Sequence, residues 1–95
     1  MNRLLIDAVN AKQIIAFQYS NVFRTAEPHA LGMDENNNLV LSAWQLSGKI
    51  GDAPDWRFYF VGKMFFLKPT GKTFSIARPG YVRNDQRMKT IYAQT

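Results

Sequence analysis

Hydrophobic and polar residues alternate along this chain with two different periods. Near the N-terminus, Leu5, Ala8 and Val9 recur at the spacing of one helical face. This spacing predicts a short helix over residues 3–12, which Asn2 can cap. Beyond it, β-branched and aromatic residues form short runs that are typical of half-buried strands. The predicted strands lie at residues 13–19, 22–28, 39–46, 56–60, 63–67 and 88–93, with a short edge strand at 74–76.

Turn-forming residues separate these runs. Pro28 has no amide N–H and is predicted to end the second strand. Thr70, Gly71 and Lys72 predict a turn before the short edge strand. Short strands joined by turns, with one N-terminal helix, predict a mainly β fold in which an antiparallel sheet curls into a small barrel and removes its unpaired edges. Glycines that suit the corners of such a barrel are Gly48, Gly51, Gly62 and Gly71.

The length of 95 residues is that of a single domain, which we assign to residues 1–95. There is no cysteine, and this excludes disulfides, thiolate metal sites and a cysteine nucleophile. No apolar run approaches the roughly 20 residues of a membrane span. The apolar stretch at the N-terminus is too short for a signal peptide. We therefore expect a cytoplasmic protein with no membrane partner.

Charge is distributed unevenly along the chain, whose formal net charge is +5. Residues 1–56 hold four basic and six acidic side chains, a net charge of −2. Residues 57–95 hold eight basic side chains and only Asp85 against them, a net charge of +7. A one-sided field of this kind attracts polyanions. The alternative is an ordinary solvated surface rich in lysine and arginine.

Residues suited to catalysis are sparse. His29 is the only histidine, and no cluster of histidines and carboxylates accompanies it in the sequence to make a metal site. The chain has no Gly-x-Ser-x-Gly nucleophile elbow. It also lacks both glycine-rich phosphate-loop motifs. We expect a protein that is not an enzyme and needs no metal or cofactor.

Residues suited to binding are better supplied. Arg24 and Arg57 each lie inside a predicted strand and beside aromatic residues. A guanidinium group presents a rigid fork that grips phosphate and stacks on bases. Tyr19 and Tyr59 are amphipathic rings that can stack on a base or pack in the core. Trp44 and Trp56 favour the core.

Three segments follow the motif order of a known family. Residues 24–31 fit the pattern Arg-x-Val-x-Pro-x-x-Leu, with Ala26 in place of valine. Residues 57–64 look like Arg-x-Phe-x-Leu-Asp-Arg-Ile, with Lys63 at the second arginine. Leu39 and Val40 occupy the places of a tryptophan and a tyrosine. Over residues 3–75 the chain thus resembles the WYL-domain family.

The resemblance implies a bacterial regulatory domain with a small Sm-like or SH3-like β-barrel. It implies ligand sensing, with a nucleotide or a single-stranded nucleic acid as the partner and transcriptional regulation as the output. Arg24, Arg57 and Lys63 would be the anion contacts, with Tyr19 and His29 nearby. No segment predicts the helix-turn-helix domain that many relatives carry, and residues 81–95 have no counterpart in the family pattern.

The alternative function is a protein-interaction or self-assembly module. Small barrels with an unpaired edge strand can add a strand from a partner. In this reading the predicted strand at 88–93 and an exposed edge would make a homo-oligomer.

Overall fold

The computed structural model describes residues 2–95, which form one helix and six strands. Strand residues make up 54% of the chain, so the prediction of a mainly β fold with a short N-terminal helix is confirmed. In chain order the elements are α1 (Arg3–Ala11), β1 (Gln13–Tyr19), β2 (Val22–Asp34), β3 (Leu39–Ser47), β4 (Asp55–Phe60), the 3-10 turn η1 (Val61–Lys63), β5 (Phe65–Thr73) and β6 (Met88–Gln94).

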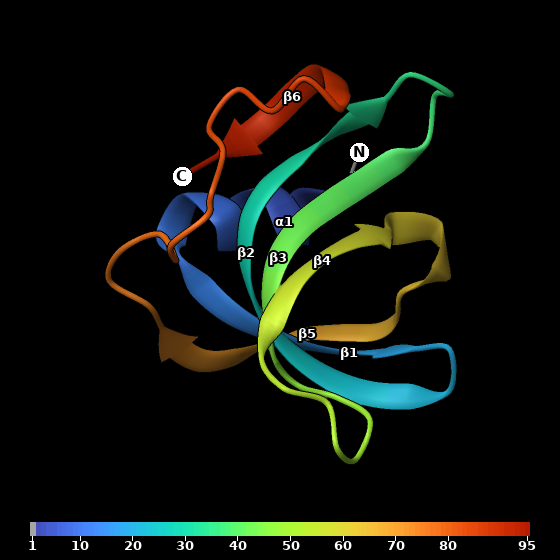
Figure 1. Ribbon diagram of the computed structural model, residues 1–95, viewed down its shortest axis with the longest axis vertical. Coiled ribbons are helices and arrows are strands. Elements are labelled where there is room, and N and C mark those ends of the chain that lie inside the picture. The colour runs from blue at the N-terminus through green and yellow to red at the C-terminus, as the bar shows by residue number, and fades with distance from the viewer. Residues whose placement is uncertain (1) are drawn as a thin grey trace.

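The strands make one antiparallel sheet with the order β4-β3-β2-β1-β5, and β6 pairs with the second half of β2. The sheet curls so that its two ends approach each other, with α1 beside β2 (Figure 1). Over residues 2–95, however, no backbone ladder joins β4 to β5. The closed barrel that we expected is therefore an open, strongly curled sheet.

Helix α1 is delimited by local capping. The Asn2 side chain accepts a hydrogen bond from the Leu5 amide at 3.4 Å. At the other end, Lys12 adopts a left-handed conformation (φ 52°), and its amide donates to the carbonyls of Ala8 and Val9. The helix therefore ends at Ala11, one residue before the predicted end. A helix of nine residues is marginal alone and depends on packing.

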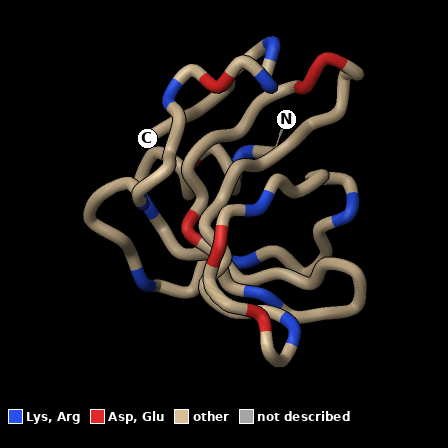
Figure 2. The backbone as a smooth tube through the Cα atoms, viewed as in Figure 1, with Lys and Arg blue, Asp and Glu red and all other residues tan. Residues whose placement is uncertain are grey.

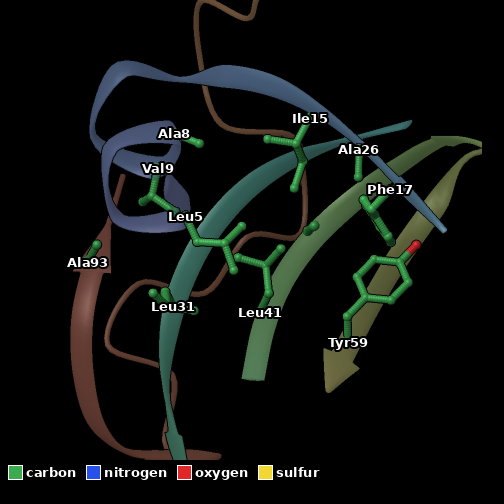
Figure 3. Packing of buried hydrophobic residues seen from close by; sticks show 11 residues of the cluster. Leu5, Ala8, Val9, Ile15, Phe17, Ala26, Leu31, Leu41, Tyr59 and Ala93 are labelled. Atoms are coloured by element: carbon green, nitrogen blue, oxygen red, sulfur yellow. The ribbon is translucent and has the colours of Figure 1, made fainter. Parts of the chain in front are cut away.

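That packing is the main core of the protein. Leu5 of α1, Phe17 of β1, Leu31 of β2, Leu41 of β3 and Tyr59 of β4 are almost fully buried. They point toward one another between the helix and the curled sheet (Figure 3). One face of each of the strands β1, β2, β3 and β4 is consequently committed to this core, and the opposite face is left for other contacts.

The prediction that Pro28 ends the second strand is wrong. Strand β2 runs for 13 residues and pairs with β1 up to Ala26, then with β6 from Ala30 onward. Pro28 lies between those two ladders, at a position where neither β1 nor β6 requires a backbone N–H donor. A register shift against β3 between Pro28 and Ala30 accommodates the change of neighbour.

The predicted turn at residues 70–72 and the predicted edge strand at 74–76 are also wrong. Strand β5 continues through Pro69 to Thr73, and residues 74–76 lie outside the strands. Gly71 has a positive φ of 84°. This turn-forming residue therefore produces an irregularity within the edge strand β5 and does not end the strand. The last predicted strand is confirmed as β6, which places the C-terminal tail on β2.

Candidate functional site

Arg24 lies on β2 with its side chain on the same face as Ala26, a core residue. Its Nε and Nη2 atoms donate to the Tyr19 carbonyl at 3.3 and 3.2 Å, and its Nη1 donates to Gln45 Oε1 at 2.9 Å. Within residues 2–95, no carboxylate lies at salt-bridge distance from this guanidinium. Arg24 is therefore held in place by neutral acceptors and keeps its charge uncompensated.

Gln45 connects Arg24 to the core. Its side chain is buried, and its Oε1 also accepts a 2.5 Å hydrogen bond from the Tyr59 hydroxyl. Burial raises the pKa of Tyr59, although the nearby positive charges of Arg24 and Arg57 oppose that effect. Tyr59 thus remains a neutral donor, and it donates to the same amide oxygen that holds Arg24.

Arg57 lies on β4, two residues before Tyr59 and on the same face of the strand. Its Nη1 donates to the Trp56 carbonyl at 3.0 Å and lies 3.4 Å from a carboxylate oxygen of Asp55. About a third of the Arg57 side chain is exposed, and the Asp55 side chain is 65% exposed. Such an exposed pair contributes less than about 1 kcal/mol and leaves the arginine available.

Tyr19 ties the two sides of the cluster together. Its hydroxyl accepts a hydrogen bond from the Phe60 amide at 3.1 Å, which links β1 to β4 across the open side of the sheet. Its ring packs edge-on against Tyr59 with 4.9 Å between centroids, and the Arg24 guanidinium stands 5.4 Å from its centroid. We call Tyr19, Arg24, Gln45, Arg57 and Tyr59 the two-arginine site.

Two predicted site residues lie elsewhere. Lys63 is on η1, where its ammonium stands 5.4 Å from the centre of the Phe60 ring. His29 is fully buried, and its ring packs against Trp56, Phe74 and Tyr81. Burial also lowers the pKa of His29. The structure thus brings Tyr19 and Arg24 into contact and places Arg57 on the neighbouring strand β4, on the same face as Tyr59. It gives His29 no exposed surface with which to join them.

Sequence reasoning missed the contacts that hold the segment between β5 and β6. Glu27 is only 3% exposed, and its carboxylate accepts two hydrogen bonds from Arg78 at 2.7 and 3.0 Å. The Arg78 amide donates to His29 Nε2 at 3.1 Å. These partners are about 50 residues apart in the chain, and no spacing or motif could have indicated the pairing.

A cavity of about 230 Å³ lies under the same segment, on the face of β3 and β4 that points away from the main core. Ser42, Phe58 and Tyr81 contribute to its lining. Asp85 and Arg87 form an ion pair in its wall, and this pairing lowers the pKa of Asp85. Arg57 also contributes to the lining, so the cavity holds one arginine beyond this ion pair.

Lysine and arginine positions are spread over several sides of the molecule and do not form one stripe (Figure 2). The excess charge of residues 57–95 therefore does not by itself define a surface. Among residues 2–95 there is no group of three or more histidines and carboxylates that could hold a metal ion, and no helix is long and apolar enough to cross a membrane. Comparisons with protein-family models, curated proteins and solved structures find no match for this chain.

Proposed function

We propose that this chain is a regulatory ligand-sensing domain that binds an anionic ligand, a nucleotide or a single-stranded nucleic acid, at the two-arginine site. The observation that carries the proposal is the state of Arg24. Its guanidinium contacts a carbonyl and an amide oxygen but no carboxylate within residues 2–95. A charged fork with neutral partners retains most of its attraction for a phosphate group.

Arg57 strengthens the proposal because its one ionic partner is weak. The Asp55 carboxylate is largely exposed and 3.4 Å away, so a phosphate can displace it at little cost. Tyr19 adds a half-buried ring beside Arg24 and against Tyr59. The resemblance to the WYL-domain family supports the same residues, since it too implies anion contacts at Arg24 and Arg57.

The experiment is a fluorescence-anisotropy titration of a labelled oligothymidylate of about 12 nucleotides, a length that spans one small β domain. It is carried out at about 50 and 200 mM salt, with a labelled nucleotide as a second ligand. Affinity should fall by about 0.7 log units per contacted phosphate for each tenfold increase in salt. The Arg57→Gln variant should lose one such contact and reduce the slope by about 0.7.

The matched control is Arg83→Gln, which removes the same charge from an exposed arginine in the segment between β5 and β6. Arg24→Gln is checked first by urea denaturation, because Arg24 also holds the Tyr19 carbonyl. Absence of saturable binding of either ligand at the lower salt would overturn the proposal. It would also be overturned if Arg57→Gln bound both ligands as Arg83→Gln does.

Self-assembly is the second candidate, and the feature that bears on it is the edge strand β5. Nearly all of its residues are exposed, and it pairs with β1 on one side only. Lys68, Pro69 and Lys72 lie on this strand, and such residues disfavour the addition of a partner strand. The tail strand β6 is already paired with β2. Sedimentation velocity tests this candidate: a single monomeric species over a wide concentration range would exclude it.

A further inference from the structure

Exposed aromatic rings lie in a row across the outer face of β2, β1 and β5. Gln18 of β1 is paired with Phe23 of β2 on one side and with Phe65 of β5 on the other. Directly paired residues share a face, and Phe17, the neighbour of Gln18, points into the core on the other face. Phe23 is 69% exposed and Phe65 is 58% exposed. The two rings therefore stand in solvent on either side of a polar side chain.

A bulge in β5 lies beside this row. Phe66 and Leu67 together oppose the single residue Phe17 in β1, because the register shifts between the pairs Ala16–Lys68 and Gln18–Phe65. Phe66 has a positive φ of 55°, a conformation that a bulky residue rarely adopts, and its ring is 73% exposed. Strained residues of this kind persist where the surrounding structure holds them, often at sites of function.

The charge around these rings is of one sign. Strands β1 and β5 and residues 22–26 of β2 contain no acidic residue. Their basic residues are Lys68 and Lys72 of β5 and Arg24, whose side chain lies on the opposite face of β2 from Phe23. Lys68 is paired with Ala16, which lies on the same face as Gln18, so this cation stands beside the row of rings. If a second copy of the chain docked on this face, the cations of the two copies would face and repel one another. A polyanion that carries flat rings is complementary to both features.

We propose that Phe23, Gln18, Phe65 and Lys68, which we call the phenylalanine face, bind the bases of a single-stranded nucleic acid by stacking. Strands are about 4.8 Å apart, so the rings of Phe23 and Phe65 arise about 10 Å from each other. That spacing leaves room for separate bases, with the Gln18 amide between them as a hydrogen-bonding group. Phe23 adjoins Arg24 in β2. A single nucleic-acid strand that passes around the β1–β2 hairpin can therefore contact both this face and the two-arginine site.

The inference rests on the proposed function for the class of ligand, and its test separates bases from phosphates. The ligands are labelled oligothymidylate and an abasic strand of the same length and charge. The variants are Phe23→Thr, Phe65→Thr and their combination, because threonine preserves strand propensity. Ile76→Thr and Val82→Thr are the matched controls, since both residues are exposed (78% and 59%) and lie outside this face.

We expect each phenylalanine variant to weaken oligothymidylate binding about tenfold, with the salt dependence unchanged. Affinity for the abasic strand should not change, and the two control variants should bind both strands as the wild type does. Arg57→Gln, in contrast, should reduce the salt dependence for both strands.

Three results would overturn the inference. The first is equal affinity of the wild type for the abasic strand and oligothymidylate. The second is a double variant that binds as Ile76→Thr does. The third is a wild-type dimer that the double variant converts to monomer in sedimentation velocity, because the face would then be occupied by a second copy. Loss of the Arg57 effect with the phenylalanine effect intact would instead refute only the two-arginine site.

Discussion

The buried His29 should make the stability of this protein depend on pH near neutrality. Its Nε2 faces the Arg78 amide, a donor, and must therefore accept, while its Nδ1 carries the proton and donates to the Glu27 carbonyl at 2.8 Å. Both ring nitrogens are thus occupied in the neutral form. A second proton would have to enter at Nε2, against an N–H group and near the positive charge of Arg78.

The magnitude follows from linkage between protonation and folding. Burial lowers the pKa of His29 below its ordinary 6.5, with Arg78 adding to the effect and the Glu27 carbonyl and carboxylate opposing it. Well above pH 6.5 neither the folded nor the unfolded chain binds the proton at His29, and His29 adds no pH dependence. Below pH 6.5, the unfolded chain binds a proton at His29 that the folded chain does not bind. The free energy of unfolding should therefore fall by up to about 1.4 kcal/mol between about pH 7.5 and pH 5.5.

Urea denaturation at a series of pH values measures this dependence directly. Tryptophan fluorescence is a suitable signal, since the Trp56 ring lies 4.7 Å from the His29 ring. His29 is the only histidine in the chain. The pKa values of Asp34 and Asp85 are lowered, and the stability that they contribute is lost only as pH falls below about 4.

The control is His29→Gln, which can still donate and accept hydrogen bonds but does not titrate. Its unfolding free energy should be flat between about pH 7.5 and pH 5.5, apart from the small effect of the N-terminal amine. The reasoning would be refuted by a wild-type protein whose stability does not change over that range. A His29→Gln protein that retained the full slope would refute it equally.

Three further substitutions test other parts of the structure. Arg78→Met should lower the free energy of unfolding, because it leaves the buried Glu27 carboxylate unpaired. An unchanged urea midpoint would contradict this. Gly32→Ala should lower the free energy of unfolding by about 2 kcal/mol and detach β6, because an added Cβ would lie 2.3 Å from the Thr90 carbonyl oxygen. The amides of β6 should therefore exchange hydrogen faster than in the wild type, and an unchanged exchange rate would contradict this. Phe66→Asn should stabilise the fold by about 1 kcal/mol by relieving the positive φ, and thermal unfolding at or below the wild-type midpoint would exclude that strain.

Elements with a clear local pattern could be predicted from the sequence. Helix α1 and strands β1, β3 and β6 lie within a residue or two of their predicted ranges. The errors fell on β2 and β5, where Pro28, Pro69 and Gly71 normally indicate an end. Each of these strands continues because a neighbouring strand tolerates the irregularity, and that neighbour is not visible in the local sequence.

The candidate site was predictable only in part. Arg24 and Arg57 were predicted as site residues from their residue type and strand position, and Tyr19 from its ring. Gln45 was not recognised, because a glutamine in a strand carries no signal until its acceptor is seen beside Arg24 and Tyr59. The phenylalanine face was missed for a similar reason, since exposed and buried phenylalanines cannot be told apart by residue type.

What the sequence by itself determined about this protein is the identity and the period of its elements, together with the groups able to bind an anion. These follow from the alternation of side chains over a few neighbouring residues, which is a short-range property. Only the tertiary structure decided the partners. The Glu27–Arg78 pair, the Phe23–Gln18–Phe65 row and the contacts of Arg24 and Tyr59 with Gln45 each join segments distant in the chain. Such contacts depend on which strands pair and in which register, and that choice is made by burial of the whole core and not by any local run of residues.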